Sequence, residues 1–234
     1  MRQLTDVVTD YVRQKRAAGT QWYTWSFRPD RVPPDVLDSR GLPGSWYDRN
    51  AILKHRLHDA WLTGPGRRAE LESYYIRDWG GVRGNRIETL ETYHRAGAEE
   101  NIARGKTGIA SWSKALCVRD PLQYAIFDAR VSTSLNALQI IHQARIDLPI
   151  RFPVLASQNR QVTQGNAQLK RHFATHGWLA EPAGFYRDYL ALCQSAGARL
   201  GVPGEPLPVY AVEMTLFAHT EELLGQAFPG AAPV

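Results

Sequence analysis

Hydrophobic residues recur at every third or fourth position along most of this 234-residue chain. That spacing places them on one face of an α-helix, whereas a half-buried strand alternates with a period of two. Only the short apolar run at residues 124–127 suggests an extended segment. The pattern therefore predicts an all-α fold. The helices are expected near residues 4–12, 53–61, 69–79, 87–104, 112–119, 129–144, 162–176, 183–196 and 209–226.

Proline and glycine gather between the predicted helices, at residues 28–46, 64–66, 145–160 and 197–208. Both residue types interrupt helices, so these stretches are expected to be loops. The sequence contains no internal repeat, and residues 229–234 are expected to form a frayed tail. A single domain over residues 1–228 is the expected organisation.

The composition is that of an ordinary globular protein, with 44% hydrophobic and 22% charged residues. No apolar run is long enough to cross a membrane, and the N-terminus lacks the hydrophobic core of a signal peptide. We therefore expect a cytoplasmic protein without a membrane partner, and a monomer.

Cysteine and histidine are too sparse to suggest a metal centre. Cys117 and Cys193 lie in apolar helical surroundings, where buried thiols are expected, and two cysteines cannot hold a four-cysteine iron–sulfur cluster. The histidine pairs within residues 55–58 and 172–176 lack a third ligand nearby. We predict neither a metal nor a cofactor.

The positive charge is unevenly distributed along the chain. The net charge is +5, and residues 1–120 hold 20 Lys and Arg against 15 Asp and Glu, whereas residues 121–234 hold 8 of each. Only five of the 28 basic residues are lysines. Arginine pairs with phosphate through two hydrogen bonds and stacks on bases, so this half of the chain suits a nucleic acid. The alternative is a solvated surface with arginine-favouring codon usage.

Residues 105–136 carry the two candidates for chemistry. The pattern predicts that a helix ends at Gly105, that a tight turn crosses residues 107–110, and that Ser111 caps a short helix. Lys114 then falls in the first turn of that helix. After a stop at Asp-Pro and the apolar run, Asp128 opens the next amphipathic helix.

Both positions favour reactivity. The partial positive charge at a helix N-terminus disfavours an ammonium group, so Lys114 there is a better nucleophile toward a sugar carbon. The same charge favours an ionised Asp128, which can stabilise positive charge on a deoxyribose as its base departs, or orient the attacking water. The alternatives are a plain helix cap for Asp128, worth about 1 kcal/mol, and a solvated Lys114.

Three motifs in this segment resemble a known family. They are Trp-Ser-Lys-Ala-Leu at 112–116, Asp-Pro-Leu-Gln-Tyr-Ala-Ile-Phe-Asp-Ala-Arg-Val at 120–131, and Ser-Leu-Asn-Ala-Leu at 134–138. The segment is similar to the core of the helix-hairpin-helix DNA glycosylases, in particular bacterial proteins with an 8-oxoguanine-glycosylase-like fold. This resemblance implies a two-lobed helical bundle with the active site between the lobes. It also implies that Asp128 is essential and that Lys114 can act as the nucleophile.

The segment departs from the family at two points. The hairpin glycines, whose amides approach a DNA phosphate, fall on Ala110 and Trp112 here. The spacing of 14 residues from Lys114 to Asp128 is shorter than usual by about one helical turn. Both departures concern the hairpin and Lys114 and leave the assignment of Asp128 intact.

Two further regions suit a base-flipping enzyme. Residues 74–86 hold arginines, an asparagine and glycine turns, which predicts a DNA-facing loop; the alternative is an ordinary loop with Trp79 in the core. The last helix places an aromatic and acidic stripe at spacings of 3 and 4, which suits a pocket for an extruded base, although each aromatic alone favours the core. The predicted DNA-binding residues are Arg77, Arg83, Asn85, Arg86, Lys106 and Arg130. The predicted base-pocket residues are Trp112, Tyr210, Glu213 and Phe217.

These features together predict a DNA glycosylase that flips a modified base out of double-stranded DNA and excises it. Water attack leaves an abasic site, whereas attack by Lys114 gives a Schiff base followed by strand cleavage. The resemblance allows two substrates: a hypermodified phage pyrimidine, such as glucosylated hydroxymethylcytosine, removed in anti-phage defence, or 8-oxoguanine removed in repair. The alternatives are a non-catalytic DNA-binding module of the same fold and a nucleoside-processing enzyme that needs no duplex.

Overall fold

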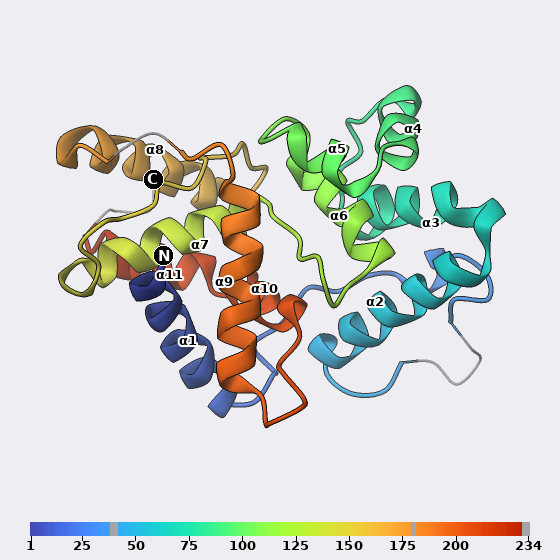
Figure 1. Cartoon of the computed structure of the whole chain (residues 1–234), viewed down its shortest axis with the longest axis horizontal. Helices are drawn as coiled ribbons and strands as arrows, with labels where there is room; N and C mark the ends of the chain where they lie inside the picture. The colour runs from blue at the N-terminus through green and yellow to red at the C-terminus, as the bar shows by residue number, and fades with distance from the viewer. Residues whose placement is uncertain (38–41, 179–180, 231–234) are drawn as a thin grey trace. The chain divides into compact units, whose positions relative to one another are not determined.

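The computed structural model describes residues 1–37, 42–178 and 181–230, and all of its regular elements are helices (Figure 1). The predicted all-α class is confirmed for these residues, in which a single isolated bridge, between Val202 and Glu205, is the only β pairing. The predicted frayed tail lies mostly outside the described residues.

The α-helices are α1 (Arg2–Ala17), α2 (Trp46–Thr63), α3 (Arg68–Tyr74), α4 (Ile87–Arg95), α5 (Ala98–Ala103), α6 (Ile109–Arg119), α7 (Ala129–Ile141), α8 (Arg160–His176), α9 (Phe185–Leu200), α10 (Val209–Ala218) and α11 (Thr220–Ala227). Short 3-10 helices are η1 (Pro29–Arg31), η2 (Pro65–Arg67) and η4 (Gln143–Arg145), and η3 (Tyr75–Trp79) is a π-helix.

Two predicted long helices are each broken into two. The helix expected over residues 87–104 is α4 and α5, because Gly97 begins a new helix and its amide donates to the Glu100 carboxylate at 2.7 Å. The helix expected over residues 209–226 breaks at His219 between α10 and α11. Neither break contains proline, and the hydrophobic spacing continues across both, which is why the pattern alone joined them.

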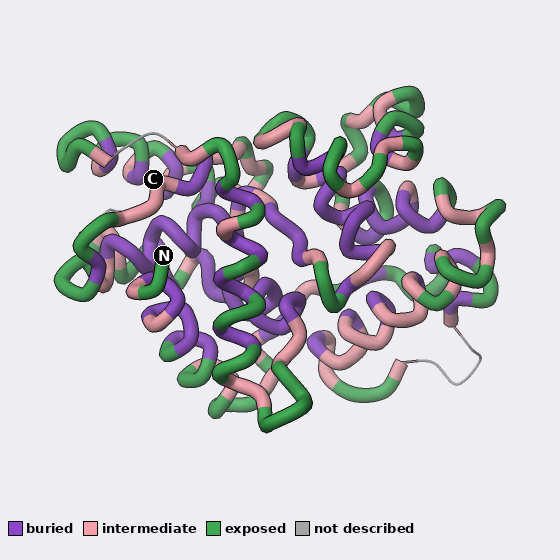
Figure 2. The backbone as a smooth tube through the Cα atoms, viewed as in Figure 1, coloured by how far each residue is buried: buried purple, intermediate pink, exposed green. Residues whose placement is uncertain are grey.

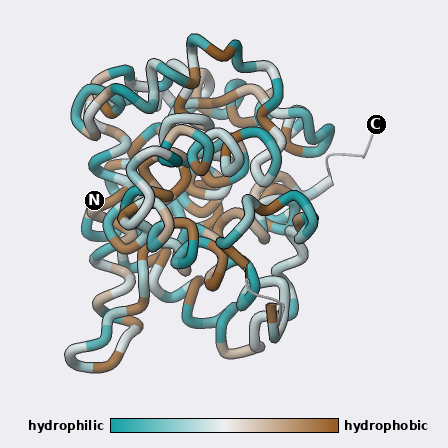
Figure 3. Tube along the Cα trace, turned by 90° about the vertical axis from the view of Figure 1, so that its right-hand side faces the viewer, coloured by the Kyte–Doolittle hydropathy of each residue, from teal (hydrophilic) through white to brown (hydrophobic). Residues whose placement is uncertain are grey.

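The chain forms two compact units. The terminal unit consists of residues Met1–Gly19 and Phe127–Val234, and the inner unit of Thr20–Ile126. Hydrophobic and hydrophilic positions are interspersed along the chain (Figure 3), as expected where one face of a helix packs and the other meets water. Among the described residues, no helix is both long and apolar enough to cross a membrane.

Helix α7 is the core of the terminal unit and is buried over most of its length (Figure 2). Its polar residues are satisfied internally. Asn136 exchanges two hydrogen bonds with the backbone of Phe152, both at 3.1 Å, and Gln139 does the same with Ile150 at 2.8 and 2.7 Å. The backbone groups of Ile150 and Phe152 thus bond to side-chain amides of α7 in place of a neighbouring strand, because buried backbone groups need hydrogen bonds. Around α7 pack α1, α8, α10 and α11.

The inner unit has a core of aliphatic and aromatic side chains from α2, α3, η3 and α6. The inner unit also contains a buried ion pair, in which the Arg119 guanidinium contacts the Glu72 carboxylate at 2.9 and 3.3 Å. Arg119 also donates to the carbonyl oxygens of Tyr93, His94 and Ala96 at 2.7, 3.1 and 2.8 Å, at the end of α4 where helix carbonyls lack partners within the helix. Cys117 in this unit and Cys193 in the terminal unit are buried thiols, as predicted.

Candidate functional site

Asp128 caps the N-terminus of α7, as predicted. Its backbone is extended, and its Oδ1 atom accepts hydrogen bonds from the amides of Arg130 at 3.0 Å and Val131 at 3.1 Å. The preceding residue, Phe127, is fully buried among aromatic rings, including Tyr189 at 5.1 Å between centroids. The apolar run therefore anchors the chain just before the carboxylate, and the two amides fix the carboxylate itself.

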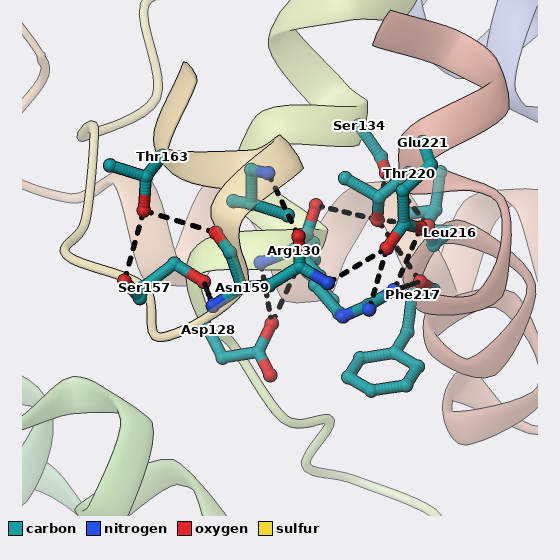
Figure 4. A network of polar contacts seen from close by, with 12 residues as sticks. Asp128, Arg130, Ser134, Ser157, Asn159, Thr163, Leu216, Phe217, Thr220 and Glu221 are labelled. Carbon is teal, nitrogen blue, oxygen red and sulfur yellow. Dashed lines mark hydrogen bonds and ion pairs between the residues drawn. The ribbon is translucent and has the colours of Figure 1, made fainter. Parts of the chain in front are cut away.

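The second carboxylate oxygen of Asp128 remains available. Oδ2 accepts no hydrogen bond from any residue that the structure describes, and the side chain is half-buried (Figure 4). An ionised carboxylate has about four acceptor sites, of which the cap uses two on one oxygen. Asp128 thus has a fixed orientation and one oxygen able to bind a water molecule or take a proton.

Arg130 is held beside Asp128 by a carboxylate rather than left open for DNA. Its guanidinium contacts Glu221 in a two-pronged pair at 2.6 and 2.9 Å and lies over the Phe217 ring at 5.0 Å (Figure 4). Asn159, the cap of α8, also donates to Glu221 at 3.1 Å. This network joins the starts of α7, α8 and α11. The sequence did not indicate Glu221 or Asn159, because 91 residues separate Glu221 from Arg130.

The predicted base-pocket residues have different surroundings. Phe217 is half-buried, whereas Tyr210 and Glu213 are buried, at 7% and 1% exposure, on the packed side of α10. Burial and the nearby Glu213 charge raise the pKa of Tyr189. Trp112 belongs to the inner unit, is fully buried, and donates to the Thr107 carbonyl at 3.1 Å. Of the four, Phe217 alone offers a partly exposed ring.

The hairpin between α5 and α6 differs from the prediction. Helix α6 begins at Ile109 and is capped by Gly108, not by Ser111, whose hydroxyl instead accepts from Asn85 at 2.6 Å. Gly105 and Gly108 have φ values of +58° and +69°, in the left-handed region that favours glycine. Two glycines with a left-handed backbone therefore lie within the turn, at 105 and 108. Ala110 and Trp112, the positions expected to replace the family's glycines, lie in α6.

The start of α6 is a potential anion site. The amides of Gly108 and Ala110 donate to no acceptor among the described residues, and Gly108 is exposed. Unpaired amides at a helix N-terminus, together with the positive end of the helix dipole, attract phosphate. A Cβ atom at Gly108 would overlap the Tyr93 hydroxyl, so the backbone approaches Tyr93 as closely as only glycine permits.

Lys114 is not where the pattern placed it. It is the sixth residue of α6, hence in the second turn, and is 3% exposed. Its Nζ donates to the Ala110 carbonyl at 2.7 Å, and its stem lies against Gly80, where a Cβ would come within 2.5 Å of the lysine Cε. The premise that the helix N-terminus activates this amine is therefore wrong, since Nζ binds a carbonyl of its own helix. The contact with Gly80 gives Lys114 a structural role under the loop that follows η3.

The loop at residues 80–86 is fixed at both ends. The amide of Gly80 donates to Tyr75 at 3.0 Å and that of Val82 to Ile76 at 3.1 Å, which closes the π-helix η3. At the other end Asn85 is tied to the first turn of α6. Trp79 is in the core, as the alternative had it, and its indole donates to Asn50 at 2.7 Å. The predicted DNA-binding residues Arg77, Arg83, Arg86 and Lys106 are exposed on this unit.

The excess of positive charge lies in the first half of the sequence but is shared by the two units. The inner unit holds 16 Lys and Arg against 13 Asp and Glu, and the terminal unit 12 against 10. The excess is therefore spread over both units, and local clusters matter more than the overall balance.

No protein-family model matches the chain, and no curated protein or solved structure is significantly similar to it. The terminal unit offers a fixed carboxylate with one available oxygen, and the inner unit offers a glycine-bordered helix N-terminus with exposed arginines nearby. The first is suited to moving a proton or stabilising a cation, and the second to binding phosphate.

Proposed function

We propose that this protein is a DNA N-glycosylase that hydrolyses the bond between a modified base and its deoxyribose, with Asp128 as the essential carboxylate. The observation that carries the proposal is the geometry of Asp128, in which Oδ1 is fixed by two amides and Oδ2 is available. The resemblance of residues 105–136 to helix-hairpin-helix glycosylases supports it. On the same resemblance, we propose that the terminal and inner units correspond to the two lobes of such enzymes.

In the proposed reaction the base leaves with the electrons of the glycosidic bond, and positive charge develops on the sugar. The Asp128 carboxylate stabilises that charge, and its Oδ2 orients a water molecule. The water oxygen bonds to the sugar carbon while its proton passes to Oδ2. The departed base then takes up a proton from solvent and Oδ2 releases its own, so the products are the free base and an abasic site, and the carboxylate is restored. The half-buried Phe217 ring is the surface on which we expect the extruded base to stack.

We propose water, rather than Lys114, as the nucleophile. A nucleophilic lysine has to be neutral and to reach the sugar carbon. Lys114 is 3% exposed and its Nζ is bonded to Ala110 at 2.7 Å, so attack would require its helix contact to be broken. The enzyme is therefore expected to leave an abasic site without strand cleavage, and borohydride should trap no covalent adduct.

The proposed partner is double-stranded DNA that contains a modified base, in anti-phage defence or in repair. The hairpin amides of Gly108 and Ala110 supply a phosphate contact, and Arg83 and Arg86 add positive charge beside it. The test substrates for identifying the excised base are duplexes that carry 8-oxoguanine, alkylated bases, hydroxymethylcytosine or glucosylated hydroxymethylcytosine. Release of a base from any of them identifies the substrate.

Asp128→Asn tests the central claim. Asparagine caps helices as well as aspartate does, so the fold should persist while the charge and the proton acceptor are lost. We expect base release to fall about 10²- to 10⁴-fold, the range of general base catalysis. Asp120→Asn is the matched control, because its Oδ1 also accepts from two amides, those of Leu122 at 2.9 Å and Gln123 at 3.1 Å.

The control variant should release the base at the wild-type rate, and circular dichroism should show both variants folded. Undiminished release by Asp128→Asn would contradict the proposal. A DNA-binding module without chemistry is the second candidate, favoured by the hairpin amides, which bind phosphate independently of Asp128. It would be identified by salt-dependent duplex binding with no base released from any substrate.

A further inference from the structure

A polar pocket on the inner unit includes Arg83 and takes no part in the chemistry proposed for Asp128. It consists of two adjoining hollows of about 380 Å³ and 230 Å³. Both are lined by Arg31, Tyr74, Asp78 and Arg83, and Arg77 lines the larger one. We call these five residues the arginine pocket.

The arginine pocket has an uncompensated positive charge. At its rim, Glu70 is neutralised by Arg67 at 3.0 Å and Arg28 by Asp30 at 2.6 Å. Inside it, the only ion pair among the described residues joins Arg31 to Asp78, at the long distance of 3.9 Å. Arg77 and Arg83 form no ion pair or hydrogen bond through their side chains with any residue that the structure describes. Three guanidinium groups thus face one carboxylate.

Tyr74 adds a neutral donor to the pocket. Its ring is buried at 6% exposure, and its hydroxyl binds no described residue. Burial, and secondly the charge of Asp78, raise the pKa of Tyr74, so the hydroxyl keeps its proton at physiological pH. A phenol that stays protonated donates a hydrogen bond to an anion, and its raised pKa makes it unsuitable as a base.

The arginines are held by three separate and well-anchored segments. Arg31 lies in η1, where its amide donates to Arg28 at 3.1 Å. Arg77 lies in the π-helix η3, and Arg83 in the loop that Gly80 and Val82 fix to η3. Because the backbone is already ordered, binding an anion costs little beyond ordering the side chains. Single-turn π-helices are frequent at functional sites.

We propose that the arginine pocket binds a phosphate group of the DNA backbone, adjacent to the one held at the start of α6. Guanidinium groups bind phosphate oxygens in pairs, and a tyrosine hydroxyl completes the donor set. Arg83 and Asn85 are two residues apart, so their Cα atoms lie within about 7 Å, and Asn85 is bonded to Ser111 in the first turn of α6. One strand can therefore reach both places. This inference rests on the proposed function in taking DNA as the partner.

The salt dependence of duplex binding tests the pocket. Each phosphate contact contributes about 0.9 to the slope of log K against log salt concentration. Arg83→Gln should therefore weaken binding and reduce the slope by about 0.9. Arg95→Gln is the matched control, with the same charge change at a surface arginine that is 76% exposed and paired with Glu91. Tyr74→Phe should weaken binding and leave the slope unchanged, because it removes a neutral donor.

Equal slopes for Arg83→Gln and Arg95→Gln would overturn the proposal. A second source of phosphate is tested with inorganic phosphate alone. If it raises the melting temperature of the wild type and not of Arg83→Gln, while the slopes for DNA stay equal, the pocket takes free phosphate and the backbone assignment is wrong. Failure of the proposed function looks different: no base is released from any duplex, whereas the slope change for Arg83→Gln persists.

Discussion

Under the proposed function, Asp128 divides its two carboxylate oxygens between structure and chemistry. Oδ1 accepts two amide hydrogen bonds and holds the start of α7, and Oδ2 is available to a water molecule. A carboxylate fixed by its own helix needs no other side chain to orient it, so it presents the same geometry before and after a substrate arrives. This separation makes Asp128→Asn informative, because the cap survives and only the charge is removed.

Gly108 is the residue on which the hairpin depends. Alanine there has to adopt φ of +69°, which costs about 1 kcal/mol or more, and its Cβ overlaps the Tyr93 hydroxyl. We expect Gly108→Ala to weaken duplex binding and to lower stability more than Gly105→Ala, because a Cβ at Gly105 meets nothing within 4 Å. Denaturant unfolding and duplex binding measure the two effects.

A second substitution separates the two causes of the Gly108→Ala effect, the backbone strain and the overlap with the Tyr93 hydroxyl. Tyr93→Phe removes the overlapping hydroxyl, so it should restore part of the stability lost in Gly108→Ala. If backbone strain at position 108 is the whole cause, the stability lost in the double variant should equal the sum of the losses in the two single variants. Equal losses for Gly105→Ala and Gly108→Ala would show that the contact with Tyr93 does not matter.

At the scale of elements, what the sequence predicted depended on how local the contacts are. The Asp128 cap was predictable because its partners are two and three residues away. The cap of α6 was not, because Ser111 has its hydroxyl engaged by Asn85, 26 residues earlier, and the left-handed Gly108 ends the turn instead. The burial of Lys114 under Gly80 likewise depends on a loop contact that helical spacing does not report.

The Arg119–Glu72 pair holds three helices of the inner unit together. Both side chains are largely buried, at 13% and 3% exposure, and Arg119 also covers the carbonyl end of α4. Replacing Arg119 by alanine leaves the Glu72 carboxylate buried without its guanidinium partner and removes the donor to the His94 carbonyl, whereas the Tyr93 and Ala96 carbonyls keep Asn101. Breaking a buried pair in this way costs about 3–5 kcal/mol.

Arg95→Ala is the control for Arg119→Ala, because it breaks an exposed ion pair, the one with Glu91 in α4. Exposed pairs at this spacing contribute about 0.3–0.5 kcal/mol. Denaturant unfolding should therefore separate the two variants by several kcal/mol. A loss below about 1 kcal/mol for Arg119→Ala would mean that water replaces the buried contacts.

At the scale of the whole molecule, the two units divide the proposed work between chemistry and binding. The terminal unit holds Asp128 and Phe217, and the inner unit holds the hairpin and the arginine pocket. The charge of the inner unit is nearly balanced, at 16 basic against 13 acidic residues, so the DNA affinity proposed for it has to come from a few individual groups. Net charge therefore predicts little about binding here, and individual arginines predict more.

The two ends of the chain meet within the terminal unit through groups that titrate. Lys15 of α1 contacts Glu222 of α11 at 2.5 Å, and His219 contacts Glu222 at 2.9 Å. Burial lowers the pKa of His219 below 6.5 and outweighs the hydrogen bond that its Nδ1 donates to Glu222. Burial acts to raise the pKa of Glu222, but its hydrogen bonds with Lys15 and His219 outweigh burial, so that pKa lies below 4.5.

Both shifts make the unfolded chain bind more protons than the folded one, so stability decreases as the pH falls. The loss from His219 begins near pH 6.5 and is complete below its folded pKa; the loss from Glu222 begins near 4.5. His219→Gln should therefore flatten the dependence of the melting temperature on pH just below pH 6.5, and Glu222→Gln should flatten it below pH 4.5. Melting curves across pH 3–8 measure both. If the melting temperature of His219→Gln falls below pH 6.5 as steeply as that of the wild type, this histidine does not make the contact between α1 and α11 sensitive to pH.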